Sequence, residues 1–217
     1  MSISLEDFSN ACLTLESSVQ SLKVSTNWED AKVLESYGTY YLRILRRITL
    51  ITHGVREHQA SGSRENKEFV EDDDEALSSS GNSVGSPAVL YDVIHSPSYQ
   101  VPVLYITFKD FAAGGTAVKD LPSVDEAYEL LVPDAYRSQI EAVGVLGALS
   151  MTDHPISGTP AYFVHPCRTA EGMDAVVGGR KTKPEEYLLM WLGMIGASVG
   201  IDVPVELAEA MSRPVQQ

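Results

Sequence analysis

The stretch AVLYDVIHSPSYQVPVLYITFK, residues 88–109, decides the fold of this chain. Its two halves, Ala88–Ile94 and Val101–Lys109, are rich in β-branched and aromatic residues, whereas residues 95–100 have the composition of a turn. Two such runs joined by a short turn predict an antiparallel hairpin. Pro102 cannot donate a ladder hydrogen bond, so it indicates an edge strand or a bulge. The second strand is therefore expected either to offer an edge to a partner's strand or to be covered by another part of the chain.

The chain before this hairpin predicts one helix and one extended segment. Residues 28–51 are expected to be extended because apolar side chains fall on alternate positions between Tyr40 and Leu50, with Arg46 interrupting that face. Ser4 is the expected N-cap of an N-terminal helix. The apolar stripe of this helix comprises Leu5, Phe8, Cys12, Leu15, Val19 and Leu22. Cys12 is therefore expected on the buried face.

The chain after the hairpin predicts two more strands and three helices. The expected strands are residues 143–151 and 161–164, and the expected helices are residues 123–132, 184–200 and 205–211. Ser123 is the expected N-cap of the first of these helices, and Pro184 the first residue of the second. The order of elements predicts a single α+β domain over residues 1–217, with a mainly antiparallel sheet and helices packed on one side.

Composition excludes several classes of partner. Thirty acidic residues against sixteen basic ones give a formal net charge of −14, which disfavours nucleic acid and anionic lipid surfaces. The acidic run Glu71–Glu75 lies within residues 56–87, which are too polar to form a core and are expected to be a disordered insertion. The sequence contains no run of about 18 apolar residues, so no transmembrane segment is predicted. Two distant cysteines without a signal-peptide core indicate a reduced, cytoplasmic protein.

The tripeptide His165-Pro166-Cys167 directly follows the β-rich run Ala161–Val164. A thiol presented where a buried strand emerges is a candidate nucleophile, because the thiolate reacts readily with a thioester. The alternative is structural: Cys167 would be a small buried apolar residue and Pro166 would merely end the strand.

Four ordered blocks give the chain a more specific resemblance. Tyr99–Tyr105, Asp153–Pro155, Phe163–Cys167 and Trp191–Gly200 together resemble the autophagy E2-like conjugating enzymes, over roughly residues 28–207 without the acidic insertion. The resemblance implies an E2-like fold and no cofactor, with ATP consumed by the E1.

The same resemblance implies a role for the cysteine. It implies that Cys167 accepts the ubiquitin-like modifier twelve as a thioester from the E1-like autophagy-related protein seven, and passes it to a lysine of autophagy-related protein five. A branch of the family that couples modifier eight to lipid is the alternative.

The sequence leaves several candidates for the residue that stabilises the oxyanion during transfer from Cys167. Ubiquitin E2 enzymes place an asparagine upstream of the cysteine, but this chain has none after Asn82, so Thr152, His154 or a backbone N–H after Cys167 is the expected oxyanion donor. His154 with Pro155 could instead order its loop.

His165 also has two possible roles. On a strand, its Cα would lie about 6.6–7 Å from that of Cys167, too far for a ready hydrogen bond. His165 would then either act as a base or fix the turn with Pro166. His154, His165 and Cys167 lack a fourth ligand, so we expect no metal.

Two other functional classes remain open at this stage. A cysteine hydrolase would need a histidine aligned on the sulfur and an orienting carboxylate or amide. A non-catalytic binding module on the same scaffold would leave Cys167 without a role.

Overall fold

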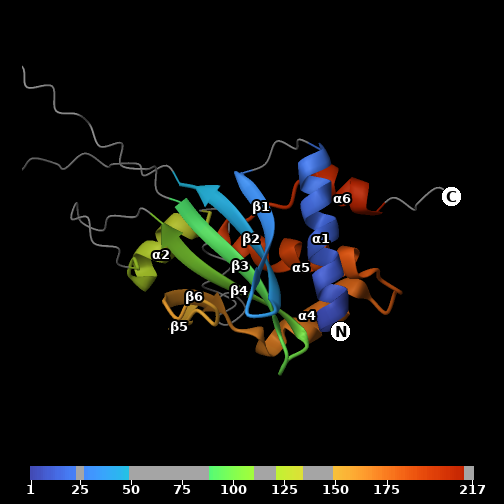
Figure 1. Ribbon diagram of the computed structural model, residues 1–217, viewed down its shortest axis with the longest axis horizontal. Helices are drawn as coiled ribbons and strands as arrows, with labels where there is room; N and C mark the ends of the chain where they lie inside the picture. Colours follow the sequence, from blue (N-terminus) through green and yellow to red (C-terminus); the bar gives the residue numbers. More distant parts are fainter. Residues whose placement is uncertain (23–26, 49–87, 110–120, 134–148, 213–217) are drawn as a thin grey trace, which may run out of the picture.

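The computed structural model describes residues 1–22, 27–48, 88–109, 121–133 and 149–212, and its centre is an antiparallel sheet (Figure 1). Six strands lie in the order β1-β2-β3-β4-β6-β5. Their bounds are β1 Asp30–Ser36, β2 Thr39–Arg47, β3 Ala88–Ser96, β4 Val101–Lys109, β5 Leu149–Asp153 and β6 Pro160–Val164. The α+β prediction with an antiparallel sheet is confirmed.

The β3–β4 hairpin forms as predicted, in continuous register from Ala88 opposite Lys109 to Ser96 opposite Val101. Of the two alternatives for the second hairpin strand, the covered one is confirmed and the edge is not, because β6 pairs with the other side of β4 through Tyr105 opposite Phe163. Pro102 lies near the start of β4, beyond that pairing, so its missing N–H interrupts no ladder bond with β6. The outer strands of the described sheet are β1 and β5.

Residues 28–48 form two strands where the sequence indicated one extended segment. β1 and β2 pair in antiparallel register, and a turn at Tyr37 and Gly38 joins them, with φ of 50° and 75°. The left-handed conformation suits Gly38, because glycine lacks the Cβ that makes this region costly. Residues 49–51 of the predicted segment lie outside the described residues, as do residues 143–148 of the predicted strand that ends in β5 and all of the acidic insertion, 56–87.

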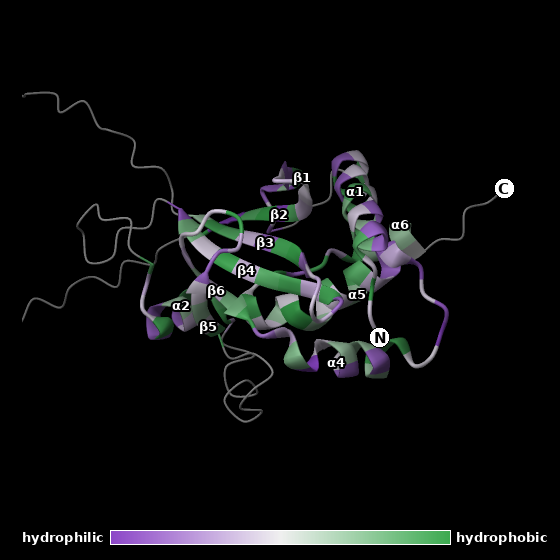
Figure 2. Cartoon of the chain, turned by 60° about the horizontal axis from the view of Figure 1, so that its bottom comes forward, coloured by the Kyte–Doolittle hydropathy of each residue, from purple (hydrophilic) through white to green (hydrophobic). Residues whose placement is uncertain are grey.

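The helices that build the core are α1 (Leu5–Leu22) and α5 (Pro184–Gly196), which pack against each other on one face of the sheet. Figure 2 shows α5, largely apolar, beneath the sheet and beside α4 (Thr169–Val177). Phe8, Cys12 and Leu15 are fully buried, as the stripe predicted. Leu5 and Leu22 are 50% and 39% exposed, so the predicted stripe is fully buried only in the middle of the helix.

The predicted capping residues are confirmed at three helices. The Oγ of Ser4 accepts the N–H of Asp7, Pro184 is the first residue of α5, and Ser123 forms a full capping box at α2 (Val124–Leu131). The last predicted helix is α6 (Val205–Ser212). None of the helices within the described ranges is long and apolar enough to cross a bilayer.

Arg46, which interrupts the apolar face of β2, joins the ends of two helical segments. Its guanidinium donates to the carbonyl oxygens of Leu130, at 3.1 Å, and of Gly200. Gly200 follows the 3-10 turn Ala197–Val199 that ends α5, with φ of +74°. A cationic group suits this place because carbonyls at the ends of helices carry partial negative charge.

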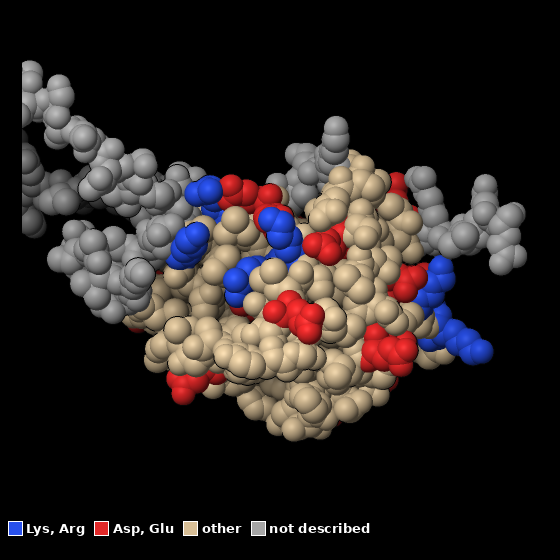
Figure 3. Space-filling model, in the orientation of Figure 1, with Lys and Arg blue, Asp and Glu red and all other residues tan. Residues whose placement is uncertain are grey.

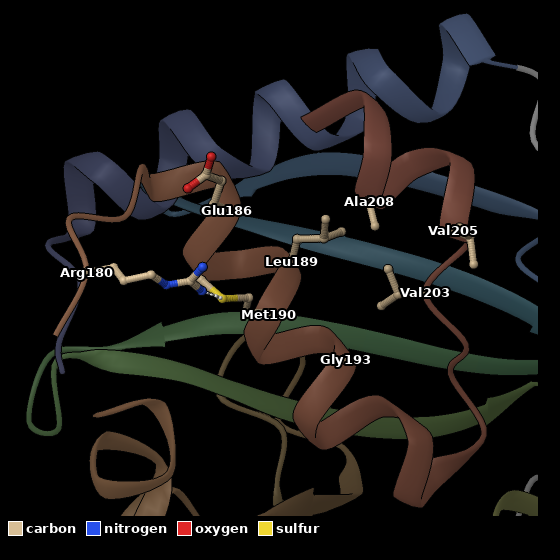
Figure 4. Close-up of a pocket in the computed structure, with 8 residues that line it drawn as sticks. All are labelled: Arg180, Glu186, Leu189, Met190, Gly193, Val203, Val205 and Ala208. Atoms are coloured by element: carbon tan, nitrogen blue, oxygen red, sulfur yellow. Dashed lines mark hydrogen bonds between the residues drawn. The ribbon is translucent and has the colours of Figure 1, made fainter. Parts of the chain in front are cut away.

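Charged groups are mixed on the face shown in Figure 3, where Lys and Arg gather over the β1–β3 side of the sheet between scattered acidic groups. A groove of about 520 Å³ lies between α5 and α6 (Figure 4). It is lined by Arg180, Glu186, Leu189, Met190, Gly193, Val203, Val205 and Ala208.

Candidate functional site

Cys167 lies on a 3-10 turn, Pro166–Arg168, between the end of β6 and the start of α4. Its side chain is exposed and forms no disulfide. The extended path to Cys167 assumed from the sequence is wrong, because the strand ends at Val164 and Pro166 begins the turn. The thiol therefore projects from a turn at the end of β6, where its exposed side chain is accessible to another protein.

The turn brings His165 back onto the backbone of Cys167. The Nδ1 atom of His165 accepts the N–H of Cys167 at 3.1 Å, a contact that an extended segment would not allow. An Nδ1 that accepts a hydrogen bond carries no proton, so the remaining ring proton is on Nε2. In this geometry His165 caps the turn that holds the thiol.

A small hollow borders the thiol. It is lined by Val164, His165, Cys167, Arg168, Thr169, Met194 and Ile195. The N-terminus of α4 lies beside it, and no side chain caps this helix. Since the first N–H groups of a helix have no partner within the helix and carry partial positive charge, they suit a nearby anion. These are the backbone N–H groups after Cys167 that the sequence suggested as oxyanion donors.

His154 is only 2% exposed; its Nδ1 atom is hydrogen-bonded within the protein, whereas Nε2 makes a close contact with a carboxylate but no aligned hydrogen bond. Nδ1 accepts the N–H groups of Ile156 and Ser157, each at 3.3 Å, and Nε2 lies 3.0 Å from Oδ2 of Asp92. Because Nδ1 accepts, the ring proton is on Nε2 and faces the carboxylate. His154 thus orders the β5–β6 turn in this structure.

Asp92 and Arg43 complete this buried cluster, and the sequence reasoning did not single out either residue. Arg43 donates from Nε and Nη2 to the two carboxylate oxygens of Asp92, both at 2.7 Å. Burial alone raises the pKa of Asp92, but the hydrogen bonds from Arg43 and the contact with the His154 ring outweigh it and hold the pKa below its ordinary value. An aspartate inside the apolar run of residues 88–94 was the signal that could have found it.

Thr152 lies on β5 opposite Ala161, on the far side of β6 from β4. Ala161 is three residues before Val164, so Thr152 is about 10 Å along the strand direction from the point where β6 ends. The structure thus brings His165, Pro166 and Cys167 together in one turn, and places His154 and Thr152 further along the β5–β6 hairpin. Within the described ranges, no three His, Cys, Asp or Glu side chains form a group that could hold a metal ion.

Comparisons with known proteins agree with the four sequence blocks. A family model described as autophagocytosis associated protein, active-site domain, matches residues 7–206. The chain is 36% identical to a ubiquitin-like-conjugating enzyme ATG10 of Gibberella zeae over 120 residues, 55% of this chain and 48% of that protein. It is 32% identical to the human ubiquitin-like-conjugating enzyme ATG10 over 126 residues, 57% of this chain and 53% of that protein.

The matched part is thus about half the length of these curated relatives. The fold also resembles a crystal structure of the autophagic E2 Atg10, with a TM-score of 0.54 and 14% identity. That likeness covers 92% of this chain and 98% of the other. At this identity it confirms the predicted E2-like fold alone. The predicted family resemblance is confirmed by the family model and the curated relatives.

Proposed function

The chain belongs to the family of autophagocytosis associated proteins, within their active-site domain, and on that premise we propose that it is an E2-like conjugating enzyme with Cys167 as its nucleophile. In this proposal Cys167 carries the ubiquitin-like modifier twelve, received from autophagy-related protein seven. A lysine of autophagy-related protein five then accepts it. The observation that carries the proposal is the exposed thiol of Cys167 on a capped turn at the end of a central-sheet strand.

The first step exchanges one thioester for another. The Cys167 thiolate attacks the acyl carbon of the modifier on the E1, a new C–S bond forms, and the E1 sulfur leaves as a thiolate. Because one thioester replaces another, the driving force is near zero and position matters most. A thiol held on a fixed, accessible turn meets that requirement.

The second step forms an isopeptide bond. A neutral lysine amine attacks the acyl carbon, the C–N bond forms, the C–S bond breaks, Cys167 leaves as a thiolate and the amine releases a proton. The oxyanion that develops needs a donor, and the N-terminus of α4 beside the thiol, which no side chain caps, supports the backbone candidate. His154 remains a supporting residue in this proposal through the turn it orders.

Thr152 is the donor candidate that a single substitution tests. We expect Thr152→Ala to leave discharge onto lysine unchanged, since Thr152 lies about 10 Å along the strand from the end of β6. A strong loss of discharge with normal loading would make Thr152 the donor and remove the backbone candidate.

The test of the proposed function is reconstitution with E1, ATP and each modifier in turn, read on a non-reducing gel. The wild-type chain should form a reductant-sensitive adduct with modifier twelve, and Cys167→Ser should form a reductant-resistant oxyester. Cys12→Ser is the matched control, because Cys12 is the other cysteine and is fully buried, and it should load normally.

Other outcomes of this experiment would contradict the proposal. Loading with modifier eight alone would assign the chain to the lipid-coupled branch. Cleavage of a modifier fusion without E1 would identify a hydrolase, and no adduct with either residue at position 167 would identify a binding module.

A further inference from the structure

The face of the sheet that points away from α1 and α5 carries four residues in register across four strands. Arg43 on β2 lies opposite Asp92 on β3. Asp92 in turn lies opposite Tyr105 on β4, and Tyr105 lies opposite Phe163 on β6. Since directly opposed residues share one face of a sheet, these side chains form a row that leads toward the strand preceding Cys167.

Ring contacts continue this row from the buried cluster to the cysteine turn. The His154 ring lies edge-on to Tyr105, with centroids 5.4 Å apart, and Tyr105 stacks on Phe163 at 6.0 Å and 19°. Phe163 then contacts the His165 ring at 5.8 Å. We call these four rings, His154, Tyr105, Phe163 and His165, the ring row. Its last member accepts the N–H of Cys167.

The buried end of the ring row is held by charge. Asp92 and His154 are each 2% exposed, and the carboxylate faces two N–H groups of Arg43 and Nε2 of His154. Removal of the carboxylate would leave Arg43 without this acceptor and His154 without the negative charge beside Nε2. A buried ion pair is weak evidence for stability, because desolvation offsets its attraction. A role in fixing the orientation of neighbouring side chains explains the buried Asp92 carboxylate better than a contribution to stability does.

We propose that Asp92 is a positioning residue for the Cys167 turn and acts through His154 and the ring row. This rests on the proposed function, in which Cys167 is the nucleophile. The Asp92 carboxylate lies 3.0 Å from Nε2 of His154 and attracts its ring N–H electrostatically, which fixes the ring plane against Tyr105. Tyr105 and Phe163 then fix the ring of His165, whose Nδ1 keeps the backbone of Cys167 in its turn.

The direct test is hydrogen exchange of the Cys167 amide, because that N–H is the one that His165 holds. Asp92→Asn should speed its exchange about five-fold, the effect of weakening one hydrogen bond. The rate at which iodoacetamide alkylates the Cys167 thiol should rise together with the exchange rate in this variant. The control is Tyr91→Phe, which removes a buried 2.8 Å hydrogen bond to the carbonyl of Val199 from the neighbouring residue of the same strand.

The control separates positioning from stability. Tyr91 faces the helices, so Tyr91→Phe should lower the melting temperature and leave Cys167 exchange unchanged. Unchanged exchange in Asp92→Asn, or an equal change in Tyr91→Phe, would overturn the proposal. If Asp92→Asn does not fold, Arg43→Lys provides the same test, because lysine cannot form the bidentate contact with Asp92.

A double-mutant cycle tests the route. Tyr105→Leu removes the ring that joins His154 to Phe163, so adding Asp92→Asn to Tyr105→Leu should give no further change at Cys167. Additive effects would show that Asp92 does not act through the ring row.

These measurements need no E1 or modifier, so they remain informative if the proposed function fails. In the reconstituted reaction, Asp92→Asn should slow single-turnover discharge about ten-fold and leave the dependence of loading on E1 concentration unchanged, as loss of positioning predicts. A change in E1 dependence alone, with normal discharge, would contradict the positioning role and point to the docking of the E1.

Discussion

Gly200→Ala is predicted to destabilise the protein strongly, through two effects that the structure separates. The first is backbone strain, because Gly200 has φ of +74°, and a side chain in the left-handed region costs about 1–2 kcal/mol. The second is steric, because a Cβ at this position would lie 2.5 Å from the carbonyl oxygen of Leu131 and would overlap the guanidinium of Arg46.

The steric effect has its own magnitude. Displacement of Arg46 weakens its hydrogen bonds to the carbonyls of Leu130 and Gly200, and a hydrogen bond to a charged group contributes about 1.5–3 kcal/mol. Together with the strain, the loss of one such hydrogen bond gives an expected destabilisation of about 2.5–5 kcal/mol, or roughly 5–20 °C in Tm for a chain of this size.

The assay is urea unfolding followed by circular dichroism, with Gly38→Ala as the matched control. Gly38 has the same left-handed backbone, with φ of +75°, but a Cβ there would meet nothing within 4 Å. Gly38→Ala should therefore show the strain alone, about 1–2 kcal/mol. Equal losses in the two variants would refute the idea that Arg46 and Leu131 leave no room at Gly200.

Three further predictions concern single groups. Folding lowers the pKa of Asp92, so the stability that its carboxylate contributes is complete above the ordinary aspartate pKa and is lost as the pH falls toward the lower folded pKa. Asp92→Asn should therefore flatten the acid side of the curve of stability against pH, below about pH 5. An unchanged slope would contradict the assignment. Burial raises the pKa of the Cys12 thiol, so a thiol reagent at neutral pH should modify one cysteine per native chain, at Cys167, and both in denaturant; two fast sites in the native protein would disprove this. Ser123→Ala removes the N-cap of α2 and should cost about 1 kcal/mol in thermal unfolding, whereas Ser123→Asp should retain the cap and most of the stability.

Local patterns predicted the elements that depend on neighbouring residues in the chain. Two runs rich in β-branched and aromatic residues around a short turn predicted the β3–β4 hairpin, Ser123 and Pro184 predicted two helix starts, and Cys12 was placed correctly on the buried face of α1. Each of these depends on interactions within one or two turns or across one short loop.

Long-range pairing accounts for what the sequence did not predict. β4 lies inside the sheet because β6, more than fifty residues later, pairs with it. Asp92 and Arg43 are 49 residues apart in the sequence, and the residues around each of them do not predict that the two side chains are in contact. The turn at Cys167 differs from the expected extended segment because Pro166 and the cap from His165 end the strand at Val164.

The cap on the cysteine turn has a consequence for where protons go in the proposed reaction. The lone pair of His165 Nδ1 is occupied by the backbone of Cys167, so that nitrogen does not deprotonate an incoming lysine. The acceptor would have to present its amine already uncharged, and the enzyme would serve as a template that holds the acyl group. Conjugation would then accelerate with rising pH as the acceptor's own lysine loses its proton, and the choice of lysine would belong to whichever surface of the acceptor makes one amine unusually easy to deprotonate.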